Sequence, residues 1–148
     1  MSLETVFTVA GGLVLGFLGG LAAWVFMPKR LKSQYFVTRW RELQNFCKDK
    51  TTWPKAIADA DKLLDRALKK RKFKGKTMGE RLVSAQRSFT DNDGVWYAHN
   101  LAKKALADNN IRLKESDVKE ALMCFRDALR DIGALPDGKS SSKAKRQA

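Results

Sequence analysis

A run of 24 residues without a charged side chain, from Thr5 to Pro28, constrains this chain more than any other feature. As an α-helix the run would be about 36 Å long, enough to cross a hydrocarbon core of about 30 Å, and this length argues against a buried core helix. A cleavable signal peptide is the competing interpretation, but it requires a basic start and an exit of small residues. Here the start carries Glu4 and no base. We therefore expect an uncleaved transmembrane anchor over residues 1–28.

Charged residues are distributed unevenly on the two sides of this run. No Lys or Arg stands in the first 28 residues, whereas all 29 bases and 15 of the 16 acids follow Pro28, giving that part a net charge of +14. Because Lys29, Arg30 and Lys32 directly follow the apolar run, the positive-inside rule predicts a single-pass protein of the cell (inner) membrane, with its N-terminus outside and its C-terminal domain in the cytoplasm. A net charge of this size attracts anionic lipid headgroups, nucleic acid or an acidic protein partner.

Three glycines repeat every four residues within the apolar run. Gly12, Gly16 and Gly20 would therefore line one side of a helix, the spacing that lets two transmembrane backbones approach closely. Glycine is also simply frequent in membrane helices. The stripe predicts a homodimer through the anchor, with ordinary glycine usage as the alternative.

Beyond the anchor, apolar residues recur every three or four positions, the period of helices rather than strands. We expect an all-α fold in which the anchor precedes a small antiparallel four- or five-helix bundle. The expected helices cover about residues 30–48, 53–72, 77–88, 91–107 and 116–132. The chain then divides into the anchor 1–28, a basic amphipathic juxtamembrane helix 29–52, a helical domain 53–135 and a disordered basic tail 136–148.

Local signals predict where these helices begin and end. The expected N-caps are Thr51 or Thr52, Thr77 with Glu80 as a capping box, Asp91 or Asp93, and Ser116. Gly75 is expected to end the helix from residue 53, and Gly133 is expected to end the last helix.

Apolar spacing predicts which face each helix buries. For the helix from residue 53 the stripe is Ala56, Ile57, Ala60, Leu63, Leu64, Ala67 and Leu68. For the helix from residue 91 it is Trp96 or Tyr97, Leu101, Ala105 and Leu106, and for the last helix it is Val118, Ala121, Leu122, Phe125, Leu129 and Ile132.

Seven bases with no intervening acid follow one another after residue 65. Such a run is often only a solvated helix end, but in a tethered domain it also suits contact with anionic lipid, or with a nucleic-acid backbone. The candidate phosphate-binding residues are Arg66, Lys69, Lys70, Arg71, Lys72, Lys74 and Lys76.

Catalytic and metal signatures are weak in this sequence. His99 is the single histidine and is expected to be structural or at the surface, and Cys47 and Cys124 have no metal-ligand spacing and are expected to be buried thiols. Asp59 with Asp61 is expected on a solvated helix face, and Asp91 with Asp93 in a helix cap. We therefore predict no catalytic residues, no metal and no cofactor.

Two stretches, WPKAIADADKLLDRALKKRKFKGKTMGERL from Trp53 and DNDGVWYAHNLAKKALAD from Asp91, carry a family resemblance. With the preceding anchor, the chain resembles uncharacterised bacterial single-pass membrane proteins whose soluble domain is similar to HEPN-type helical domains. Active members use an Arg and a His with four to six residues between them. In this chain the positions at that spacing before His99 are Asn92, Asp93 and Gly94, and none is Arg. The stretch 101–108 has Ala at the positions that correspond to the Arg and the His of the motif. The resemblance therefore implies the fold without the nuclease chemistry.

These observations predict a membrane-tethered, non-enzymatic binding or scaffold module on the cytoplasmic face. The alternative is an RNA-binding domain derived from a HEPN-type ribonuclease fold, which would use the basic run and the tail on phosphates. A residual enzyme is a third class.

Overall fold

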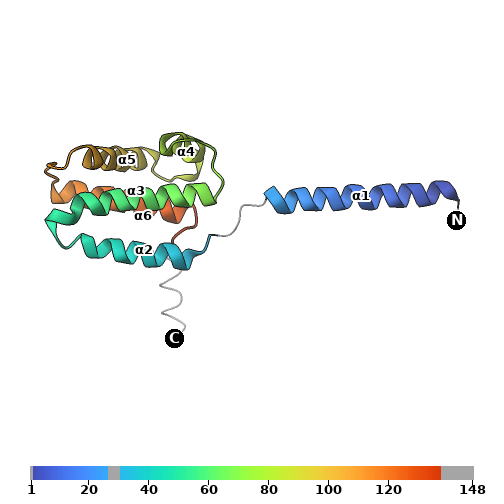
Figure 1. Cartoon of the computed structure of the whole chain (residues 1–148), viewed down its shortest axis with the longest axis horizontal. Helices are drawn as coiled ribbons and strands as arrows, with labels where there is room; N and C mark the ends of the chain where they lie inside the picture. The colour runs from blue at the N-terminus through green and yellow to red at the C-terminus, as the bar shows by residue number, and fades with distance from the viewer. Residues whose placement is uncertain (1, 27–30, 138–148) are drawn as a thin grey trace, which may run out of the picture.

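The computed structural model describes residues 2–26 and 31–137, and within them the regular structure is helical, without strands. Figure 1 shows the order of the elements along the chain. They are α1 (Leu3–Phe26), α2 (Ser33–Phe46), the 3₁₀ turn η1 (Lys50–Thr52), α3 (Trp53–Lys70), α4 (Met78–Ala85), the 3₁₀ turn η2 (Gln86–Ser88), α5 (Asn92–Ala107) and α6 (Glu115–Asp131). The all-α class predicted from the sequence is confirmed.

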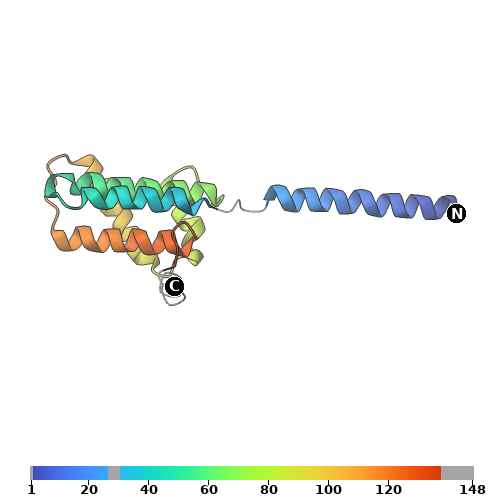
Figure 2. The same cartoon turned by 90° about the horizontal axis from the view of Figure 1, so that it is seen from below.

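Helix α1 contains the apolar run from Thr5 as far as Phe26. Its stretch Glu4–Ala23 is the one segment of residues 2–26 and 31–137 that is long and apolar enough to cross a membrane. Figures 1 and 2 show α1 apart from the other helices. Residues 4–23 are exposed. Lys29 and Arg30, on which the predicted orientation depends, lie outside the described residues, as does most of the predicted tail from residue 138.

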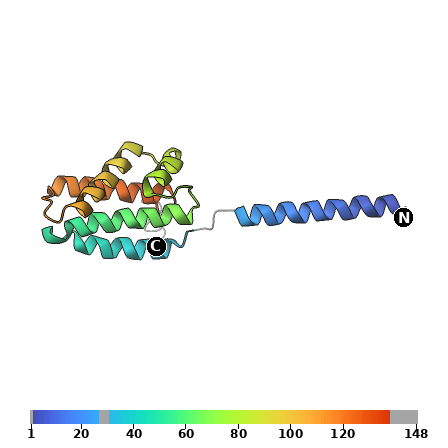
Figure 3. The ribbon, with the colours of Figure 1, turned by 45° about the horizontal axis from the view of Figure 1, so that its top comes forward.

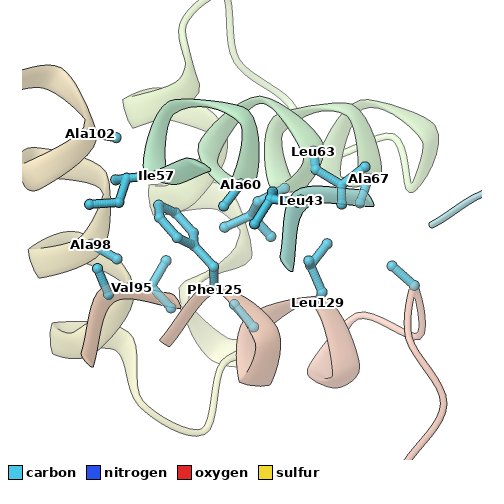
Figure 4. Packing of buried hydrophobic residues seen from close by; sticks show 14 of the residues in the cluster. Leu43, Ile57, Ala60, Leu63, Ala67, Val95, Ala98, Ala102, Phe125 and Leu129 are labelled. Carbon is cyan, nitrogen blue, oxygen red and sulfur yellow. The ribbon is translucent and has the colours of Figure 1, made fainter. Parts of the chain in front are cut away.

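Helices α2, α4, α5 and α6 pack around α3, which contacts each of them. All seven residues of the stripe predicted for this helix are buried, as the 3.6-residue period requires. From α6, Phe125 points toward Ile57 and Ala60 of α3, with Ala98 of α5 close by (Figure 4). Figure 3 shows α4 and α5 together on one side of α3 and α2 on the other.

Helix α2 belongs to the same hydrophobic core. Phe36 and Leu43 are buried in the cluster that α3 to α6 form. The segment 29–52, predicted as a juxtamembrane element, therefore contributes to the core of the helical domain, which we define as residues 33–135.

One predicted N-cap is wrong, and another occupies its predicted position without a side-chain bond. Thr52 is the N-cap residue of α3, as predicted, but its hydroxyl donates backward to the Asp49 carbonyl at 2.9 Å and accepts no bond from α3. Ser116 lies inside α6, which begins at Glu115 without a side-chain cap. Glu115 and Asp117 stand in the first turn of α6, where the positive end of the helix dipole favours acids.

The other two predicted N-caps are confirmed. Thr77 Oγ1 accepts a bond from Glu80 N at 3.2 Å, and Asp91 Oδ1 accepts one from Gly94 N at 2.9 Å. The Glu80 carboxylate accepts from Lys76 N at 2.6 Å, one residue before the position that a standard capping box uses.

The face that α5 buries matches the prediction in part. Ala105 is buried as predicted, and Trp96 and Leu101 pack against the core partly buried. Leu106 is 57% exposed and Tyr97 is exposed, whereas Val95, Ala98, His99 and Ala102 are buried. The sequence pattern favoured the large apolar side chains, but the close packing of α5 against α3 and α6 suits small side chains at the contact.

Candidate functional site at the C-terminal end of α3

The seven predicted basic residues occupy the end of α3 and the connection to α4. Arg66, Lys69 and Lys70 lie on the last turns of α3 and are exposed, and the others follow the helix. Arg71 is half-buried, whereas Lys72, Lys74 and Lys76 are exposed. The structure therefore keeps most of these charges in solvent, on one end of the helical domain.

The helix ends in a tight turn that presents these bases. Phe73 N donates to Leu68 O at 3.1 Å and Lys72 N to Lys69 O at 3.0 Å, the bonding pattern of a Schellman motif. The left-handed position of this motif, usually glycine, is occupied by Lys72 with φ of 61°. The sequence predicted Gly75 as the stop, but α3 ends at Lys70, five residues earlier.

Gly75 instead allows a close approach between the turn and α4. Its φ is 151°, and a Cβ atom there would lie 2.7 Å from Arg81 N. The Arg81 guanidinium donates to Gly75 O at 2.7 Å, and Ser84 Oγ donates to Lys74 O at 2.6 Å. The basic turn is therefore fixed to α4 by hydrogen bonds on consecutive residues.

Arg81 also joins the turn to α3. It is buried, and its Nε lies 2.6 Å from Asp65 Oδ1, while Lys69 Nζ lies 2.8 Å from Asp65 Oδ2. Burial by itself would raise the pKa of Asp65, but the bonds and charges of Lys69 and Arg81 hold this pKa below its ordinary value. Asp65 stays ionised and anchors two cations.

A tyrosine from α2 completes the site. The Tyr35 ring has Arg66 Cζ at 5.0 Å, Lys70 Nζ at 5.4 Å and Arg39 Cζ at 5.6 Å from its centroid, within cation–π range. Arg66 also donates a hydrogen bond to the Tyr35 hydroxyl. These contacts place the start of α2 against the end of α3. Sequence reasoning missed the roles of Tyr35 and Arg81, because neither lies in the basic run.

The short connection between α1 and α2 limits how far this basic end can lie from α1. Seven residue steps separate Phe26, the last residue of α1, from Ser33, the first of α2, a reach of at most about 25 Å. Tyr35 stands two residues farther on. The basic end is therefore the end of the helical domain nearest to α1, as Figure 1 shows.

No family model, curated protein or solved structure matched this chain. The resemblance to HEPN-type domains stays a prediction.

The one histidine forms a buried pair with an aspartate. His99 Nδ1 lies 2.8 Å from Asp61 Oδ1, and both residues are buried, with the Trp96 ring edge-on to the imidazole at 5.9 Å. The expectation that Asp61 lies on a solvated face is wrong, since α5 supplies its partner. Asp59 points elsewhere and pairs with Lys55 at 3.0 Å. The two aspartates therefore do not form a carboxylate couple.

The remaining predicted residues add no reactive group to the basic end of the helical domain. Cys47 and Cys124 are half-buried free thiols, less enclosed than predicted. Asp91 serves as the cap of α5, and Asp93 lies in its first turn. Among residues 2–26 and 31–137, no group of three or more His, Cys, Asp or Glu side chains could hold a metal ion.

The glycine stripe lies open on α1. A Cβ atom built at Gly12, Gly16 or Gly20 would meet no atom within 4 Å. Self-association of the anchor stays a prediction.

Proposed function

We propose that this protein is a membrane-tethered, non-enzymatic helical binding module that rests its basic end on anionic lipid headgroups at the cytoplasmic face of the cell membrane. The observation that carries the proposal is the coincidence of two features. The exposed cations gather on the end of the helical domain that a short connection holds near α1, the helix able to cross a membrane. A charged surface held there lies within reach of the headgroup layer.

The orientation follows from the charge asymmetry. The first 28 residues carry no Lys or Arg, so the positive-inside rule favours an N-terminus outside and a helical domain in the cytoplasm. The cytoplasmic leaflet is the one that carries the negative surface potential of anionic lipids. The same side of the membrane therefore receives the domain and attracts its basic end.

The geometry of the turn favours binding to headgroups. Each Lys or Arg near an anionic surface contributes about 1 kcal/mol, an attraction that falls off within a Debye length of about 8 Å. Because hydrogen bonds with Arg81, Ser84 and Glu80 already fix the backbone of residues 74–76, little backbone conformational entropy is lost when lipid binds. A fixed cationic surface therefore binds more strongly than a flexible one of equal charge.

The proposal includes the finer architecture expected from the sequence, an antiparallel four- or five-helix bundle. The contacts of Tyr35 with Arg66 and Lys70 support it, because they place the start of α2 against the end of α3. A bundle with this arrangement presents helix ends, rather than helix faces, toward the membrane.

Hydrogen exchange of the full chain in lipid nanodiscs tests the headgroup contact. The chain is reconstituted in phosphatidylcholine discs and in discs with about 30% phosphatidylglycerol, a fraction chosen to give an anionic surface. Amides of residues 70–77 should exchange more slowly in the anionic discs, and this protection should decline as salt is raised. Equal exchange in the two kinds of disc would contradict the proposal.

Charge reversal supplies a matched control. Lys74→Glu with Lys76→Glu, both exposed, should abolish the lipid-dependent protection. Lys103→Glu with Lys104→Glu makes the same change near the end of α5, at the opposite end of the domain from α1 (Figure 1), and should leave the protection intact. Loss of protection in both pairs would show a general charge effect rather than a site.

The RNA-binding alternative is tested with the same discs. A 20-residue oligouridylate is titrated against the chain in phosphatidylcholine discs at low and moderate salt. Tight binding with a steep salt dependence, lost in Lys74→Glu with Lys76→Glu, would favour nucleic acid over lipid.

A further inference from the structure

A groove between α2 and α6 lies outside the basic end and has no role in the function proposed above. It consists of two adjoining hollows of about 210 and 370 Å³ that share Trp40, Gln44 and Arg126. Figure 2 shows α2 and α6 running side by side on this face of the domain. From Val37 to Cys47 the α2 wall extends over about 15 Å, close to three helical turns.

The floor of the groove is apolar. Trp40 and Leu122 are half-buried, and Met123 is 54% exposed, a large apolar surface for solvent. Val37 and Leu135 extend this floor toward the end of α6. Exposed apolar area that follows two helices is typical of a surface that receives a third.

The rim of the groove is basic. Its charged lining residues are Arg41, Lys119, Arg126 and Arg130, and none of the lining residues is acidic. Lys119 pairs with Glu115 at 2.7 Å, and Arg126 and Arg130 share Asp127 at 3.3 and 3.7 Å. Within the described part of the chain Arg41 forms no ion pair, and the buried Nε of Arg130 has no hydrogen-bond partner. The rim therefore retains an unpaired positive charge at Arg41.

We infer that this groove binds an amphipathic helix with acidic flanks, supplied by a protein partner. The apolar floor fits residues spaced at i, i+3, i+4 and i+7, and the rim fits Glu or Asp on both sides of that stripe. The basic tail of this chain and a second copy, with its net charge of +13, carry the wrong sign. A groove three turns long also fits a helix better than it fits a single lipid headgroup.

Designed peptides test this inference on the full chain in phosphatidylcholine discs. The probe is a dye-labelled 18-residue helix with Leu at the stripe positions and Glu on the flanks, and its binding is followed by fluorescence anisotropy. One control peptide has every Glu replaced by Lys, and another has the same composition with the Leu positions scrambled. The acidic stripe peptide should bind at least about tenfold more tightly than either control.

Two exposed groove positions and two matched positions elsewhere locate the site. Arg41→Glu and Met123→Gln should each weaken binding about fivefold, through lost attraction and lost apolar contact respectively. Arg87→Glu and Val83→Gln make the same changes outside the groove, where Val83 is also 54% exposed, and should change binding less than about twofold.

Several outcomes would overturn the inference. They are no binding of the acidic peptide, binding equal to that of either control peptide, or equal weakening by Arg87→Glu and Val83→Gln. A fourth outcome concerns the peptide-free discs. If sedimentation shows a dimer and Arg41→Glu disperses it, a second copy of the chain occupies the groove instead.

Discussion

Replacing Arg81 by Met should release the basic turn from α3 and α4. The guanidinium is buried and donates to Asp65 Oδ1 at 2.6 Å and to Gly75 O at 2.7 Å. Methionine keeps an apolar stem of similar length but has neither donor. The substitution therefore removes two bonds while it leaves most of the packing.

The loss of stability depends on the ion pair that Asp65 keeps with Lys69. A hydrogen bond to a charged group contributes about 1.5–3 kcal/mol, and an orphaned buried charge costs about 3–5 kcal/mol. Lys69 remains 2.8 Å from Asp65 Oδ2, so the carboxylate keeps a counter-charge and the larger cost does not apply. The two lost bonds belong to one guanidinium and their contributions are not additive, so we expect the free energy of unfolding to fall by about 2–3 kcal/mol rather than by twice the value of one bond.

Urea unfolding of the full chain in detergent micelles, followed by tryptophan fluorescence, measures this change. The control is Arg87→Met, an exposed arginine on η2, which should shift the free energy of unfolding by less than about 0.5 kcal/mol. A loss below about 1 kcal/mol in Arg81→Met would refute the reasoning, because it would mean that neither bond contributes.

The pH dependence of stability independently checks the contact between Arg81 and Asp65. Because the folded pKa of Asp65 is lowered, its contribution is present above the ordinary aspartate pKa of about 4 and is lost as pH falls through the folded value. The wild-type chain should lose stability below about pH 4, and Arg81→Met should lose less over the same interval. Parallel pH profiles for the two chains would contradict the role given to Arg81.

Three further changes test other parts of the structure. Phe125→Ala, at a fully buried position between α3 and α6, should lower the free energy of unfolding by about 3–5 kcal/mol in urea titration, and a loss below 1 kcal/mol would place this ring outside the core. Lys72→Gly should raise the same quantity by about 0.5–1 kcal/mol, since its φ of 61° suits glycine, and a loss of stability would contradict the backbone assignment. Burial raises the pKa of the Cys47 and Cys124 thiols, so iodoacetamide at pH 8 should alkylate both more slowly than free glutathione in a mass-spectrometric time course; equal rates would show open thiols.

Local sequence signals predicted well wherever the determining contacts are close along the chain. The caps at Thr77 and Asp91 depend on residues three positions away, and the left-handed stop at Gly133 depends on the last turn of α6. Ser116 failed as a cap because the acids at 115 and 117 allow the helix to begin two residues earlier, at Glu115. Leu106 failed as a core residue because the packing of α5 depends on which side chains its neighbours present.

The sequence by itself determined the apolar run of α1, the all-α class and the buried stripe of α3, since composition and the 3.6-residue period specify them without knowledge of neighbours. Only the tertiary structure decided that Asp61 pairs with His99, that Arg81 joins Asp65 to Gly75, and that Tyr35 lies among three cations. The hydrogen bonds between Asp61 and His99, between Arg81 and Asp65, and between Arg66 and Tyr35 join residues 38, 16 and 31 positions apart. No local pattern encodes such pairs, because they arise when helices that each bury their own stripe settle against α3.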